Sequence, residues 1–438
     1  MTVPVAPPAP TPATAASAAP PAPGRPLMAQ RDFAALWWGQ LVSILGDRFN
    51  YLALLGLLAT HTDSFRDSRA SLLLSILGNV MLAPVLLFSP FAGAWIDRMN
   101  LRRVMIASDT MRAVLVALIP VTYLATHRPA PVFVLVFLLF TCNVLFLPAK
   151  SALTPEIVPP ESLLAANALL SGAGIAATAV GALVGGWVVD HWGWANALYI
   201  DAATYLVSVG TLWAVRYRPR PARTSATEVT AQGYLAEVGE GWKLVRKTPA
   251  VRLAMLTLGT VWIGGGFLHV AGNQHIQRAA SIPGMERVGV LMCVLGLGAG
   301  LGTWWVDRKA RHVPRHVLLG AGLVLSAGFL VGIAVSSRFA VYAIAAFFVG
   351  FCIAPVFVLS ETLLQLGTDL TRRGRIFSAR DFVMRLVFMI GVALAGTITR
   401  AEGTSVALLT AAGVVAAAGA VTLWRGRIEL QVPGTTGG

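Results

Sequence analysis

Twelve long apolar stretches constrain what this chain can fold into more than any other feature of its sequence. A helix needs roughly twenty mostly apolar residues to cross the hydrocarbon core of a bilayer. Such stretches lie at residues 36–60, 71–95, 104–125, 132–149, 163–189, 194–215, 251–270, 288–306, 317–335, 339–359, 382–399 and 404–424. The sequence therefore predicts an all-α membrane protein with twelve transmembrane helices.

The composition argues against an ordinary soluble domain. Hydrophobic residues make up 56% of the chain and charged residues 12%, whereas about a quarter of the residues in soluble domains are charged. The net charge of +14 first suggests a nucleic-acid partner, but the charges fall in short clusters between apolar stretches. We therefore expect the chain to meet a lipid bilayer and no nucleic acid.

Lysine and arginine are biased to one side of the predicted helices. With the N-terminus inside, 24 of the 34 basic residues fall on the inner side, seven on the outer side and three within helices. Cytoplasmic loops of membrane proteins carry such an excess. We expect a multi-pass protein of the cell (inner) membrane with both termini in the cytoplasm.

The chain is predicted to contain two six-helix bundles, a linker and two tails. Its first residues are dominated by Pro and Ala and cannot bury enough apolar surface to fold, and the central polar segment includes an expected amphipathic surface helix at about 233–247. In order, we expect a disordered cytoplasmic tail at 1–30, a bundle at 31–215, a cytoplasmic linker at 216–250, a bundle at 251–425 and a cytoplasmic tail at 426–438.

The two halves repeat one motif. Asp97-Arg98 ends the second predicted helix and Asp307-Arg308 ends the eighth, and each pair is followed by more arginine and another helix. Internal duplication of a multi-helix unit is typical of secondary transporters. The repeat therefore predicts two pseudo-symmetric bundles.

The first copy of this motif, Gly93-Ala-Trp-Ile-Asp-Arg-Met-Asn-Leu-Arg-Arg103, resembles a loop of the major facilitator superfamily. Asn100 stands where the family has a second glycine, and asparagine is the next best residue for a left-handed turn. The resemblance implies a cytoplasmic gate in which Asp97 meets the N-terminal end of the eleventh helix; the alternative is that these charges only set the topology. The expected gate residues are Gly93, Asp97, Arg98, Arg102, Arg103, Asp307, Arg308 and Asp381, with Arg380 nearby.

Four further stretches are similar to the bacterial exporter branch of this family, which includes enterobactin and macrolide efflux proteins. They lie at residues 38–47, 153–167, 240–249 and 373–378. The resemblance implies a central cavity lined by the first, fourth, seventh and tenth helices and exposed alternately to each side of the membrane. The fourth helix lacks the arginine that drug–proton antiporters of the family usually carry.

Polar and charged residues inside helices are candidates for a substrate or proton pathway, because a lone charge at the bilayer centre costs about 2.5–3.5 kcal/mol. Asp47 could carry protons or belong to a structural pair, and Asp109 with Arg112 one turn later favours a structural ion pair. Glu361 and Arg385 could contribute to an ion pair that rearranges during transport. The candidates are Asp47, Arg48, Asn50, Asp109, Arg112, Asn143, Trp262, His269, Asn273, Glu361, Gln365 and Arg385.

These features predict a proton-driven secondary exporter of amphipathic small molecules such as a drug, macrolide or siderophore, acting as a monomer. Four aromatic residues on the expected cavity helices suit such a cargo: Phe49, Phe146, Trp262 and Phe357. A lysophospholipid flippase of the same fold and a non-transporting membrane receptor remain alternatives. The sequence has no ATP-binding loop, catalytic constellation or converging metal ligands, so we expect no enzyme activity, cofactor or metal.

Overall fold

A computed structural model of the chain describes residues 26–67, 69–96, 99–216, 231–279, 284–309, 312–366 and 373–429. These residues form helices and connecting turns, without a β-strand. Twelve helical segments among them are long and apolar enough to cross a membrane. The predicted all-α membrane fold is confirmed.

The first six spans form one bundle. Several helices extend beyond the apolar stretches from which they were predicted, because a helix can continue through polar residues where it leaves the hydrocarbon. The helices are α1 (Arg31–His61), α2 (Ala70–Ile96), α3 (Leu101–Thr126), α4 (Pro129–Ile157), α5 (Leu163–Trp192) and α6 (Trp194–Ala214).

The second bundle follows a separate helix, α7 (Ala231–Lys247), which covers the expected amphipathic segment. The first span of the second bundle is not one regular helix, because a π-helical turn, η3, joins α8 to the short helix α9. The elements are α8 (Pro249–Phe267), η3 (Leu268–Gly272), α9 (Asn273–Ala279), α10 (Met285–Lys309), α11 (Arg315–Val335), α12 (Phe339–Leu366), α13 (Arg373–Glu402) and α14 (Thr404–Glu429).

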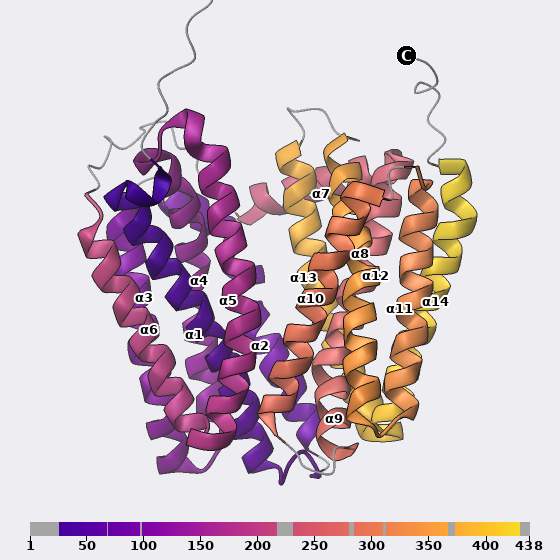
Figure 1. Cartoon of the computed structure of the whole chain (residues 1–438), viewed down its shortest axis with the longest axis horizontal. Helices are drawn as coiled ribbons and strands as arrows, with labels where there is room; N and C mark the ends of the chain where they lie inside the picture. Colours follow the sequence, from indigo (N-terminus) through magenta and orange to yellow (C-terminus); the bar gives the residue numbers. More distant parts are fainter. Residues whose placement is uncertain are drawn as a thin grey trace, which may run out of the picture.

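The two bundles stand side by side, and α7 lies across one end of the molecule (Figure 1). The same end holds the start of α1 and the end of α14, as an even number of crossings requires. We call it the α7 end and the opposite end, with α9 and the loop between α1 and α2, the distal end. Figure 1 shows the bundles closer together at the distal end than at the α7 end.

Small residues let the bundles meet closely along two helix pairs, α5 with α10 and α2 with α13. A Cβ atom added to Gly186 would lie 2.8 Å from the Cα of Glu286, closer than atoms can pack. On the other side, the Ser75 hydroxyl donates a hydrogen bond to the Val392 carbonyl across 3.1 Å. These contacts lie in the distal halves of the four helices.

Polar contacts between the bundles close the distal end. Asp63, Ser64 and Phe65 have positive φ values of 46°, 55° and 64°, and this turn buries the Phe65 side chain completely. The Phe65 carbonyl accepts hydrogen bonds from Gln274 Nε2 at 3.0 Å and Arg278 Nε at 2.8 Å, both on α9. The first bundle is thereby attached to the second through the backbone of its first loop.

A second polar contact at the distal end joins α5 to the first turn of α10. The Asp190 carboxylate accepts the backbone N–H of Met285 at 2.7 Å and of Glu286 at 2.8 Å. The first N–H groups of a helix lack partners within it and favour a negative charge. Asp190 therefore caps a helix of the opposite bundle.

Candidate functional site

A cavity of about 450 Å³ lies between the bundles, a size typical of small-molecule sites. One bundle contributes side chains from α1, α2 and α4, and the other from α8 to α13. Most of the lining is apolar; Trp262 forms part of it and packs edge-on against Phe388, with ring centroids 5.9 Å apart. We call this space the central cavity.

Four of the polar residues that line the central cavity come from two helical segments, and a fifth, Tyr342, lies on α12. Arg48 and Tyr51 are one turn apart on α1, and His269 and Asn273 are one turn apart in the span of α8, η3 and α9. A hydrogen bond of 2.9 Å joins the Tyr51 hydroxyl to His269 Nδ1 and so connects the bundles. The Asn273 amide donates to the His269 carbonyl at 2.7 Å.

His269 lies within the π-helical turn, a feature often found at functional sites. Three glycines, 264–266, precede this turn, and a Cβ atom on Gly266 would lie 2.7 Å from the Val392 backbone nitrogen. The neighbouring span α13 therefore approaches the backbone directly before the turn. The glycine run was the only sequence signal of this irregularity, and it does not distinguish a π turn from close packing.

A second cavity of about 150 Å³ lies within the first bundle. Among the described residues lining it are Asp47, Asn50, Arg112, Asn143 and Tyr205. Four residues of the central cavity line this space as well: Arg48, Tyr51, Met81 and Phe140. We call it the side cavity.

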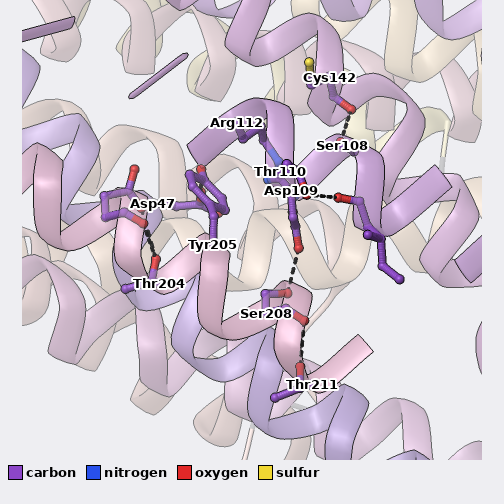
Figure 2. Close-up of polar contacts among 12 residues, drawn as sticks. Asp47, Ser108, Asp109, Thr110, Arg112, Cys142, Thr204, Tyr205, Ser208 and Thr211 are labelled. Atoms are coloured by element: carbon purple, nitrogen blue, oxygen red, sulfur yellow. Dashed lines mark hydrogen bonds and ion pairs between the residues drawn. The ribbon is translucent and has the colours of Figure 1, made fainter. Parts of the chain in front are cut away.

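Asp47 is held by a residue that the sequence analysis did not select. The Tyr205 hydroxyl of α6 donates a hydrogen bond of 2.5 Å to Asp47 Oδ1. Figure 2 shows the Tyr205 ring between Asp47 and the pair formed by Asp109 and Arg112. Nearby, Asn50 donates to Asp201 across 2.9 Å. Both contacts join α1 to α6.

Asp109 and Arg112 form an ion pair inside the first bundle. Their side chains are 0% and 3% exposed, so the pair is removed from water. Asp109 also accepts a hydrogen bond of 2.6 Å from Ser208, as Figure 2 shows. The guanidinium carbon of Arg112 lies 4.3 Å from the centre of the Phe146 ring and 4.6 Å from that of Tyr205.

Three of the four aromatic residues expected at the cavity lie elsewhere. Phe49 is buried and faces Gly185 of α5, while Phe146 lies under Arg112. Phe357 is exposed outside both cavities, so only Trp262 of this set lines the central cavity. Knowing which helix carries a residue was insufficient to predict whether it lines the cavity. A single helix presents side chains to the cavity, to its own bundle and to the outside.

The charges near the α7 end pair differently from the expectation for Arg385. Arg380 contacts Glu361 of α12 in an ion pair and reaches the adjacent Asp381 at 2.6 Å. Arg385 forms no ion pair with any described residue, because Arg380 is the cation that pairs with Glu361 and Asp381. Glu361, Gln365 and Arg385 line neither the central nor the side cavity.

The expected gate motif is described in part. Asp97 and Arg98 lie outside the described residues, so their predicted gate contacts remain expectations. Asn100 has a φ of −73° and accepts the Arg103 N–H, so it caps α3 instead of forming a left-handed turn. Arg102 donates to the Trp213 carbonyl at 3.2 Å, and this contact ties α3 to α6.

Comparison with known proteins gives a consistent result. The uncharacterized MFS-type transporter YfiS of Bacillus subtilis (strain 168) is 25% identical over 404 residues, covering 90% of this chain and 93% of that one. Macrolide efflux protein A of Streptococcus pyogenes is 22% identical over 387 residues, covering 83% of this chain and 88% of that one. The predicted resemblance to this exporter branch is confirmed.

A solved structure has the same fold. It is a bacterial homolog of the human lysosomal transporter Spinster in an inward-facing and occupied conformation, with a TM-score of 0.72 at 12% identity. The alignment covers 94% of this chain and 100% of that one. A family model described as Major Facilitator Superfamily matches residues 36–369, and the chain thus belongs to this superfamily of membrane transporters.

Proposed function

We propose that this chain is a secondary active exporter of amphipathic small molecules. The observation that carries the proposal is the central cavity, which lies between two bundles and combines an apolar wall with five polar side chains. A transporter of two bundles works by rocking them about such a site. The efflux function named for one relative supports the outward direction.

The distribution of basic residues supports an orientation in which the α7 end and both termini lie on the cytoplasmic side of a cell (inner) membrane. The closed distal end then faces outward. In this arrangement the cavity takes its cargo from the cell side. Export requires the distal contacts of Asp190 and Phe65 to break while the helices approach one another at the α7 end.

Protons are the proposed driving ion, and Asp47 is the proposed carrier. Asp47 lines the side cavity, and its neighbour Arg48 lines both cavities. Protonation of Asp47 would therefore change the electrostatic potential at the central cavity over a short distance. The Tyr205 hydroxyl holds the carboxylate in place. The cargo and coupling sites both lie within one chain, which supports a monomeric transporter.

We expect Asp47→Asn to abolish proton-driven export and to leave folding intact, because amide and carboxyl groups have similar sizes. The measurement uses proteoliposomes with an imposed pH gradient and follows erythromycin, a dansylated fatty acid and a labelled lysophospholipid. The matched control is Asp63→Asn, since the Asp63 carboxylate is exposed and meets Arg66 of its own loop at 3.9 Å.

Gradient-dependent flux of none of these compounds would reject the export proposal. Flux of the lysophospholipid alone, independent of the gradient, would instead assign the chain as a lipid flippase. Unchanged gradient-dependent flux in Asp47→Asn would remove Asp47 as the proton carrier.

A further inference from the structure

Arg48 carries a charge beside the central cavity that has no ion-pair partner among the described residues. It is the only residue with a permanent charge among the described residues lining this cavity. Its Nε atom is buried without a hydrogen-bond partner, and its side chain forms no ion pair with a described residue. An unpaired guanidinium at membrane depth is unfavourable, so a partner is expected to meet it at some stage of the transport cycle.

The nearby carboxylates of the first bundle are engaged elsewhere. Asp47 accepts the Tyr205 hydroxyl, Asp109 pairs with Arg112, and Asp201 accepts the Asn50 amide. No Asp or Glu is found among the described residues that line the central cavity. The part of the chain that the structure describes therefore supplies no anionic partner for Arg48 on the cavity side.

The central cavity is amphipathic in a specific sense. Arg48 and Tyr51 share one face of α1, and Tyr51 contacts His269, so the polar groups gather on one side. The wall includes Met81, Trp262, Leu291, Met292 and Phe388. A ligand that satisfied both parts would carry a polar head at Arg48 and an apolar body along this wall.

We propose that the cargo of the central cavity is an amphipathic anion whose carboxylate or phosphate head pairs with Arg48. The planar guanidinium offers a fork of N–H donors that matches both kinds of oxyanion. This inference rests on the proposed function, because it takes the central cavity as the cargo site. It adds the charge of the cargo and the residue that recognises it.

The first test compares ligands that differ only in charge. Purified full-length protein in detergent is titrated near neutral pH with dansylaminoundecanoic acid, its methyl ester and the corresponding dansyl alkyl amine, and dansyl fluorescence reports binding. We expect the carboxylate to bind about 10- to 100-fold more tightly than the ester, as for other charge-assisted hydrogen bonds. Equal or tighter binding of the ester or the amine would overturn the proposal.

The second test assigns this preference to Arg48. We expect Arg48→Gln to reduce the ratio of carboxylate to ester affinity to about twofold or less, mainly by weakening the binding of the carboxylate. Arg48→Lys keeps the charge and should retain part of the ratio. Arg400→Gln, which removes an exposed arginine at the distal end of α13, should keep all of it. A full ratio in Arg48→Gln would refute the assignment.

Lysophosphatidic acid separates the two sources of an anionic head. Displacement of the dansyl carboxylate by this lipid in an Arg48-dependent manner would identify a lipid phosphate as acceptable cargo, and lack of displacement would restrict the site to carboxylates.

Failure of the proposed export function and failure of the anion inference are distinguishable. Arg48-dependent binding without gradient-driven flux would reject export alone, whereas flux of neutral cargo that survives Arg48→Gln would reject the anion proposal alone.

Discussion

Replacing Arg112 with Ala should destabilise the folded protein by about 3–5 kcal/mol, because it leaves the buried Asp109 charge without its counter-charge. Ser208 would remain as a hydrogen-bond donor to Asp109, but one hydroxyl cannot replace an ion pair. The loss of the cation would also remove the contacts with the Phe146 and Tyr205 rings. Thermal unfolding of the purified protein in detergent measures the change.

The control for this prediction lies on the same helix. Arg103 is exposed near the start of α3, and Arg103→Ala should change stability by less than about 0.5 kcal/mol. The double variant Asp109→Leu with Arg112→Met should recover much of the loss, since it removes both charges of this pair together. Equal stability of Arg112→Ala and Arg103→Ala would contradict a stabilising role for the pair.

Asp190→Ala should shift the molecule toward states in which the distal end is open. The substitution removes the acceptor of two backbone N–H groups at the start of α10, in the opposite bundle. Loss of a helix cap costs about 0.5–2 kcal/mol, which corresponds to roughly a 2- to 30-fold change in the ratio of closed to open states. The opening should occur without unfolding, because α5 and α10 keep their own backbone hydrogen bonds.

Spin labels on exposed residues at the distal end can measure this shift. Asn196→Cys lies on the first bundle and Arg338→Cys on the second, in a background that lacks the three native cysteines. Electron–electron distance measurements should show more of the long-distance population in Asp190→Ala. Asp63→Asn is the matched control, because asparagine tolerates the positive φ of this position and the Asp63 carboxylate contacts only Arg66 among its ion-pair partners in the described loop. Identical distance distributions in the two variants would show that Asp190 does not hold the bundles together.

Local patterns predicted some contacts of the candidate site. Asp109 and Arg112 are three residues apart on a helix, so their shared face followed from helical geometry. The spacing of Arg48 and Tyr51 is the same, and a tyrosine one turn from a buried arginine was a signal that the sequence analysis passed over. Contacts between distant segments had no such signal: Tyr205 lies 158 residues from Asp47, and His269 lies 218 residues from Tyr51.

The sequence alone determined that this chain is an all-α membrane protein with twelve spans in two related halves, because apolar length and internal repetition are properties of the linear chain. It also placed Asp47, Arg48, Asp109 and Arg112 within helices, where their charges require partners. Tertiary structure decided which partners they have. The rotation of each helix about its axis and the π-helical turn at His269 determine which side chains meet. Packing leaves Arg48 at the central cavity without an ion-pair partner among the described residues, while Asp47, Asp109 and Asp201 are engaged elsewhere.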